Sequence, residues 1–173
     1  MPNFTVIIKH YKRKHWQNKI DEINWFRSQS SLIQAIELAA IAKDHRGMRY
    51  SHQRRIKLLA LDRAKTVLLG NMTNIFQQCL TFEQVHELVK TELHKICGIG
   101  ELYVYDTSFR IGAKLNLFPE KVYLHRGVRK GASALGLDIA GHAIEIDTLP
   151  DELKHLPLYE VEDILCIYKD QFN

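Results

Sequence analysis

The sequence contains few residues that would constrain a fold covalently or conformationally: of 173 residues only 3 are cysteine and 4 are proline. No apolar run approaches the roughly 20 residues that a helix needs to cross a bilayer, so no membrane association is expected. Cys79, Cys97 and Cys166 are odd in number, far apart and set in apolar segments. We therefore expect buried, reduced thiols and a cytoplasmic protein.

Motifs for cofactors and metals are also missing. The nine histidines show no HxxxH or HxH spacing and no pair of cysteines has zinc-ligand spacing, so no metal site is expected. There is no Walker loop, Rossmann fingerprint or GxSxG motif, and no cofactor is expected. The opening stretch MPNFTVIIKHYKRKHW has too short an apolar segment for a signal peptide. Whether the protein is an enzyme stays open, because no complete catalytic apparatus is visible.

The charge is distributed unevenly, although the net value is only +4. Residues 1–60 hold 12 Lys and Arg against 4 Asp and Glu, whereas residues 61–173 hold 12 against 16. A concentrated positive charge raises the local potential and favours a polyanionic partner such as nucleic acid. The alternative is a solvated basic surface without a partner.

The hydrophobic pattern predicts a mainly α, single compact helical domain over residues 1–173, with one or two very short strands. With 46% hydrophobic and 25% charged residues, the composition is typical of a globular chain. Residues 1–29 form a basic N-terminal arm or helix, in which residues 4–8 are a short strand or a packed arm. Ser30 and Ser31 favour an N-cap at the start of a helix, and Thr81 with Gln84 makes a capping box. Two other expected helices are residues 53–70 and 101–117.

The stretch ICGIGELYVYDTSFRIGAKLNL, residues 96–117, places the turn Gly98-Ile99-Gly100 between two helices. Glycine lets a phosphate approach without meeting a Cβ, and the amides that open the second helix point at the anion. This pattern resembles the helix-hairpin-helix of DNA-repair proteins, including glycosylases of the endonuclease III type, over residues 81–137. The resemblance implies contact with DNA phosphates, with Ile99 as an apolar plug between the helices.

The resemblance does not extend to glycosylase activity. The family's catalytic lysine belongs just after the second glycine, where this chain has Glu101 and Leu102. Asp106 follows Gly100 by only six residues, inside the second helix. The blocks GIGELYVYDTSFRIGAKL, VYLHRGVRKGA and VEDILCIYK also look like those of a group of uncharacterised small bacterial proteins, which implies no activity. The alternative for the turn is a structural corner, since Glu101 would repel a phosphate.

Two further groups of polar residues are candidates for a site. Asp106 and Arg110 lie four apart on an otherwise apolar helix and are expected to pair within the fold; the alternative is a catalytic or ligand-binding Asp106. The block VYLHRGVRKGA contains a histidine and three cations without an acid, which favours an anion site over a solvated loop. Its polar residues are His125, Arg126, Arg129 and Lys130. Arg54 and Arg55 add charge beside another helix start.

These observations favour a DNA-binding protein that contacts backbone phosphates with little sequence preference. The residues assigned to binding are Gly98, Ile99, Gly100, Arg126, Arg129, Lys130, Arg54 and Arg55. One alternative is an enzyme acting on a nucleic acid or a phosphorylated small molecule, with Asp106 and His125 as acid and base. Another is a protein-interaction partner of a larger repair or defence enzyme, using the acidic segment 151–173.

Overall fold

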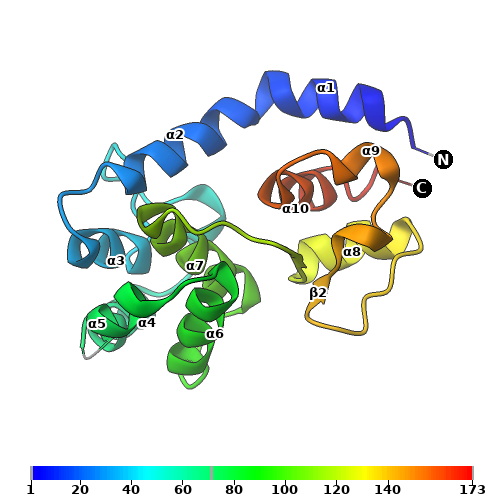
Figure 1. Cartoon of the computed structure of the whole chain (residues 1–173). Coiled ribbons are helices and arrows are strands. Elements are labelled where there is room, and N and C mark those ends of the chain that lie inside the picture. The colour runs from blue at the N-terminus through cyan, green and yellow to red at the C-terminus, as the bar shows by residue number, and fades with distance from the viewer. Residues whose placement is uncertain (1, 71, 173) are drawn as a thin grey trace. The chain divides into compact units, whose positions relative to one another are not determined.

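The structure is a computed structural model that describes residues 2–70 and 72–172. Within these residues it contains ten α-helices, two 3-10 turns and one two-stranded antiparallel sheet, which confirms the mainly α prediction (Figure 1). The sheet pairs β1 (Val122–Tyr123) with β2 (Ala143–Ile144). The helices are α1 (Phe4–Lys14), α2 (Trp16–Arg27), α3 (Leu32–Ala40), α4 (Leu58–Leu69), α5 (Met72–Gln78), α6 (Phe82–Leu93), α7 (Glu101–Leu115), α8 (Arg126–Ala134), α9 (Asp151–Lys154) and α10 (Leu158–Ile167).

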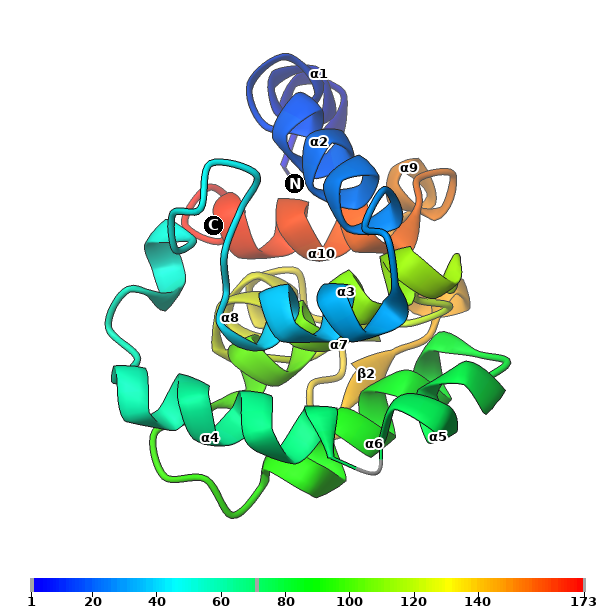
Figure 2. The same ribbon diagram turned by 90° about the vertical axis from the view of Figure 1, so that its left-hand side faces the viewer.

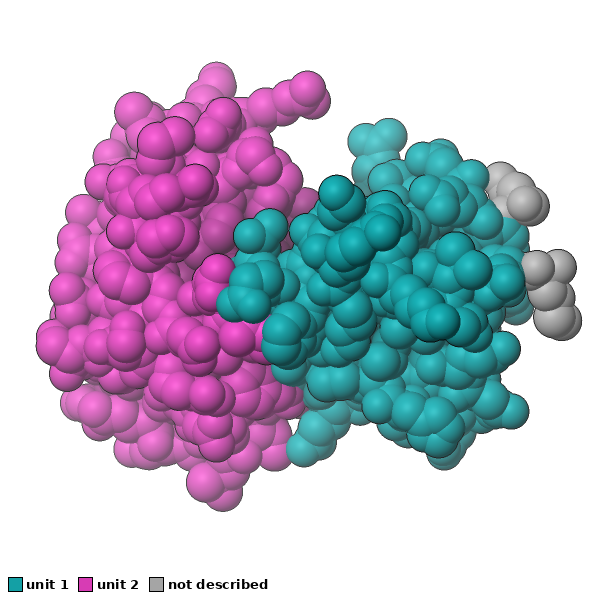
Figure 3. All heavy atoms as spheres, turned by 90° about the horizontal axis from the view of Figure 1, so that it is seen from above, with its two compact units in different colours: residues 1–19, 119–173 teal, residues 20–118 magenta. Residues whose placement is uncertain are grey.

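The chain divides into two compact units (Figure 3). One unit comprises residues 1–19 and 119–173, and the other comprises residues 20–118. The boundary therefore falls inside α2. The sequence predicted a single domain, and the division into two units does not decide that prediction.

The unit formed by residues 20–118 is organised around α7, which packs against α3 and α6 (Figure 2). The residues of α7 from Tyr103 to Ala113 are buried with the exception of Asp106, which is half-buried. The apolar residues on two sides of this helix explain why it occupies an interior position. A polar side chain on such a helix must find its partners within the fold.

The starts of α3 and α6 follow the predicted caps. Ser31 accepts a hydrogen bond from the Gln34 amide at 3.1 Å. Thr81 accepts from the Gln84 amide at 3.2 Å while the Gln84 side chain accepts from the Thr81 amide at 3.3 Å, which completes the capping box. Each cap satisfies amides that the first helical turn leaves without a partner, and so fixes where the helix begins.

The unit formed by residues 1–19 and 119–173 is built around α10, which packs against α8, β1 and α1. Its buried core includes Phe4, Val122, Val128, Leu153 and Leu165. The predicted very short strands are present as β1 and β2.

Residues 4–8 are not a strand or an arm, as the sequence had suggested, but the first turns of α1. The Asn3 side chain caps this helix by accepting from the Val6 amide at 3.2 Å. Phe4, Ile7 and Tyr11 then recur at helical spacing and are buried together. The run of β-branched residues favoured a strand, but the cap and the buried stripe outweigh that preference.

The cysteines are free, as expected, but they are less buried than predicted. Cys79 and Cys166 are half-buried, and Cys97 is exposed. The prediction of a buried Cys97 is wrong because α6 ends at Leu93, so the chain leaves the packed helix face before it reaches the thiol. No helix in the described ranges has both the length and the apolar character that a membrane span requires.

Candidate nucleic-acid interface

The turn that joins α6 to α7 has the backbone of an open glycine corner. Gly98 has a φ of 90°, a conformation that side chains with a Cβ rarely adopt. Gly100 is the N-cap of α7, with φ −114° and ψ 175°. A Cβ built at either glycine would have no other atom within 4 Å, apart from its chain neighbours. The space in front of both glycines is therefore open.

The N-cap residue of α7 is Gly100, which has no side chain to cap the first turn. The helix ladder starts with the Val104 amide, which donates to the Gly100 carbonyl at 3.1 Å. The amides that precede Val104 have no carbonyl partner inside the helix, as at any helix N-terminus. An uncapped and exposed N-terminus is suited to an anion, because the helix dipole places partial positive charge there.

Two residues at this turn are not ideal for binding a phosphate. Ile99 is half-buried, and its amide donates to the Ile96 carbonyl at 3.2 Å. Its side chain is therefore not fully enclosed, as an apolar plug would be. Glu101 is exposed at the start of α7 and adds negative charge beside the first-turn amides. Lys95, also exposed, supplies positive charge on the other side of the turn in the sequence.

The basic block of α8 is used largely within its own unit. The Arg129 guanidinium donates to the carbonyls of Ile139 and Gly141 at 2.7 and 3.2 Å, and so holds the following loop. Lys130 pairs with Asp170 between two exposed side chains. Arg126 is exposed. Of the three cations of the block, Arg126 is thus the one best placed to meet an external anion.

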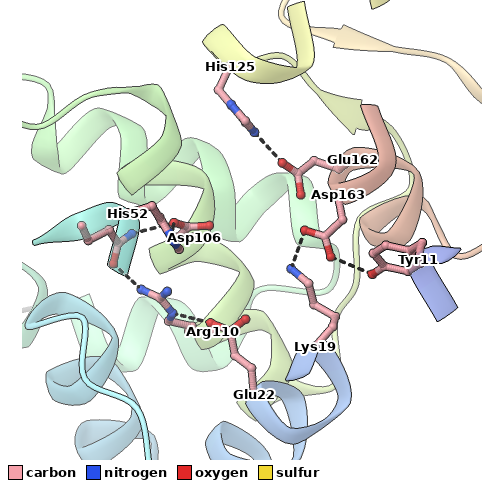
Figure 4. A network of polar contacts seen from close by, with 10 residues as sticks. Tyr11, Lys19, Glu22, His52, Asp106, Arg110, His125, Glu162 and Asp163 are labelled. Carbon is pink, nitrogen blue, oxygen red and sulfur yellow. Dashed lines mark hydrogen bonds and ion pairs between the residues drawn. The ribbon is translucent and has the colours of Figure 1, made fainter. Parts of the chain in front are cut away.

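His125 also has an internal role, because it is the N-cap of α8. Its Nδ1 accepts a hydrogen bond from the Gly127 amide at 3.3 Å. Its Nε2 is hydrogen-bonded to the Glu162 carboxyl (Figure 4). The start of α8 is therefore capped by the protein, unlike the start of α7.

Arg54 and Arg55 project from the loop between a 3-10 turn, Ser51–Gln53, and α4. Both are exposed. The loop is closed by Arg49, whose guanidinium donates to the carbonyls of Ile56 and Arg54 at 2.9 and 3.2 Å. Arg49 therefore shapes the backbone that presents Arg54 and Arg55.

Asp106 is held in a polar network of the unit formed by residues 20–118. Its Oδ2 is 2.7 Å from His52 Nε2 (Figure 4). The same oxygen accepts from Gln53 Nε2 at 2.6 Å. Gln53 in turn accepts from Arg110 Nη1 at 2.9 Å, and Arg110 Nε donates to Glu22 at 2.8 Å. Asp106 and Arg110 were expected to form one pair, and Gln53 bridges them in this network.

The network has a buried end and an exposed end. The Arg110 side chain is 1% exposed and its guanidinium carbon lies 3.8 Å from the centre of the Tyr50 ring. The His52 side chain is 44% exposed. Its hydrogen bond to Asp106 raises the pKa of His52 above the ordinary value, although burial opposes the shift.

We expect Asp106→Asn to lower the pKa of His52, because the uncharged amide removes the stabilisation of the imidazolium. A histidine whose folded pKa is raised stabilises the fold fully below its unfolded pKa, and loses that contribution as pH rises through the folded value. An NMR titration of the imidazole measures the change, with Asp62→Asn on the exposed face of α4 as control. An unaltered His52 titration in Asp106→Asn would contradict the assignment.

The two acid–base candidates of the enzymatic alternative lie in different units. Asp106 belongs to residues 20–118, and His125 belongs to the other unit. Each of the two side chains has hydrogen-bond partners within its own unit, and the sequence did not predict these partners. Glu22 and Gln53 gave no sequence signal, whereas Glu162 could have been noticed as an acid between the apolar residues of α10.

The acidic segment 151–173 is turned partly inward. Glu160 is 2.6 Å from Lys12 Nζ and accepts from the Trp16 indole at 3.1 Å. Asp163 accepts from the Tyr11 hydroxyl at 2.8 Å and pairs with Lys19 at 3.2 Å (Figure 4). These acids neutralise cations of α1 and α2, so less negative surface is left for a protein partner than the sequence had suggested.

No protein-family model, no curated protein and no solved structure matches the chain. The resemblance to helix-hairpin-helix proteins therefore stays a prediction.

Proposed function

We propose that the protein binds DNA through its backbone phosphates, with little sequence preference, and that the turn before α7 contacts one phosphate. The observation that carries this proposal is the uncapped start of α7 behind two open glycines. Backbone amides at such a position bind an anion without reading the bases. The mode of binding is therefore expected to position the protein on the duplex rather than to select a sequence.

Exposed cations supply the electrostatic part of the proposal. Arg54, Arg55 and Arg126 are exposed, and no ion-pair partner is found for their guanidinium groups among the described residues. Lys130 can exchange its exposed partner Asp170 for a phosphate, whereas Arg129 is engaged by two carbonyls. The expected number of cations available to phosphates is therefore smaller than the basic residues of the sequence suggest.

The affinity for duplex DNA is expected to fall with salt in proportion to the phosphates neutralised. About three arginine–phosphate contacts give a slope of about −2.7 in log affinity against log salt. This corresponds to roughly a fortyfold loss between 50 and 200 mM salt. The amides of the turn add affinity without adding to the slope, because they carry no net charge. Fluorescence anisotropy over a salt series measures the slope.

A low-salt panel of duplex, single-stranded and RNA probes tests the choice of partner. We expect the duplex to bind at least as tightly as the others. Binding that does not depend on salt, or an absence of binding at low salt, would contradict the proposal. Tighter binding of RNA than of DNA would support the contact with phosphates but would contradict DNA as the partner.

A further inference from the structure

Three side chains with metal-binding atoms meet in the unit formed by residues 1–19 and 119–173. Glu162 and Cys166 lie four residues apart on α10, a spacing that places them on one face of a helix. His125 comes from the N-cap of α8, which packs against α10. One nitrogen, one oxygen and one sulfur from these residues all lie within 4.8 Å of one another.

Two glycines of α8 bring these groups together. A Cβ at Gly127 would lie 2.4 Å from Cys166 Sγ and 3.4 Å from Cε1 of His125. A Cβ at Gly131 would lie 2.1 Å from the Leu165 carbonyl oxygen. Any larger residue at these positions would therefore push α8 away from the face of α10 that carries the thiol and the carboxyl.

The cluster lies largely inside its unit. The side chains of His125 and Glu162 are 3% and 5% exposed, and Cys166 is half-buried. These side chains are thus shielded from solvent, which suits a metal site held by the fold rather than an ion at the surface.

We propose that His125, Glu162 and Cys166 bind one divalent transition-metal ion of the zinc type. Imidazole, thiolate and carboxylate are the ligands that Zn²⁺ uses in proteins, and three protein ligands leave a fourth position for water. With metal–ligand distances of about 2.0–2.3 Å, tetrahedral ligand atoms lie about 3.3–3.8 Å apart. The three ligand atoms lie within 4.8 Å of one another, and His125 Nε2 and the Glu162 carboxyl, which share a hydrogen bond in the metal-free protein, must move apart to admit the ion. The mixed nitrogen and sulfur set disfavours Mg²⁺ and Ca²⁺, which prefer oxygen.

The proton balance of the site is defined by the hydrogen bonds of His125. Its Nδ1 accepts from the Gly127 amide, so its Nε2 shares a proton with Glu162 in the metal-free protein. When the metal binds Nε2, that proton is displaced and Nδ1 takes one up, which ends the weak bond from Gly127. The Cys166 thiol releases its proton as Sγ coordinates. With Glu162 ionised, binding releases one proton in total, and affinity rises with pH.

Titration of the full chain with Co²⁺ tests the site, because thiolate-bound tetrahedral Co²⁺ has a sulfur-to-metal charge-transfer band and strong visible bands. We expect saturation at one equivalent and loss of both bands when Zn²⁺ is added. Cys166→Ser should abolish the charge-transfer band. Glu162→Gln, which keeps the shape of the side chain, should weaken Co²⁺ binding about tenfold or more. Cys97→Ser, at an exposed thiol of the other unit, is the matched control and should leave the titration unchanged.

The proposal is overturned if wild-type protein shows no charge-transfer band, or if the band survives in Cys166→Ser. It is also overturned if Glu162→Gln binds Co²⁺ as the wild type does. Circular dichroism establishes that each variant keeps its helices. The Glu162→Gln titration decides the outcome if Cys166→Ser fails to fold.

Discussion

Replacement of Arg110 by methionine is expected to lower the free energy of unfolding by about 3–5 kcal/mol. The guanidinium is buried, donates to Glu22 and Gln53, and lies over the Tyr50 ring. Methionine has a comparable length, so the loss comes mainly from the groups that it leaves unpaired rather than from a cavity. Glu22, whose side chain is 14% exposed, would retain its negative charge but lose its ion pair with Arg110.

Urea unfolding measures this effect, with Arg55→Met as the matched control. Arg55 is exposed, so its replacement should change the stability by no more than about 0.5 kcal/mol. Addition of Glu22→Gln to Arg110→Met should cost less than the sum of the two single changes, because the second change removes the charge that the first one strands. A loss below about 1 kcal/mol in Arg110→Met would contradict the role assigned to the network.

Replacement of Gly100 by aspartate is expected to weaken duplex DNA binding about tenfold or more without loss of stability. The φ and ψ of Gly100 suit a capping residue, and its Cβ would enter open space. The carboxylate would accept from the first-turn amides and should leave the stability unchanged or raise it by about 0.5 kcal/mol. It would also occupy the place proposed for the phosphate and repel the anion.

Gly100→Asn separates the effect of the cap from that of the charge. Asparagine caps a helix about as well as aspartate but is neutral, so its affinity should lie between those of the wild type and Gly100→Asp. Anisotropy at low salt and urea unfolding on the same samples give both quantities. The proposal for the turn fails if Gly100→Asp binds as tightly as the wild type.

The sequence predicts well those features that depend on neighbours along the chain. The Ser31 cap, the capping box of Thr81 and Gln84, and the burial of α7 on two sides each follow from residues within a few positions of one another. Such signals depend on the local sequence, and they place the helices that hold the turn at Gly98. The main local error, at residues 4–8, arose because the Asn3 cap and the buried stripe of α1 outweigh β-branched propensity.

Partnerships between distant residues were predicted much less well. Asp106 and Arg110 were recognised as a pair four apart, but their bridge through Gln53 joins residues more than 50 positions away. Arg129 satisfies carbonyls of a loop beyond α8, and His125 meets Glu162 on α10. Spacing rules for metal ligands examine one segment at a time, so a set divided between α8 and α10 was not detected.

The backbone amides of Glu101, Leu102 and Tyr103 provide the most direct test of the proposed phosphate contact. A ¹H–¹⁵N NMR titration of the full chain with a short duplex at low salt follows each of them separately. We predict that the signals of these amides show the largest saturable shifts and return toward their positions in the free protein as salt is added. A duplex that binds while these three signals stay in place would contradict it.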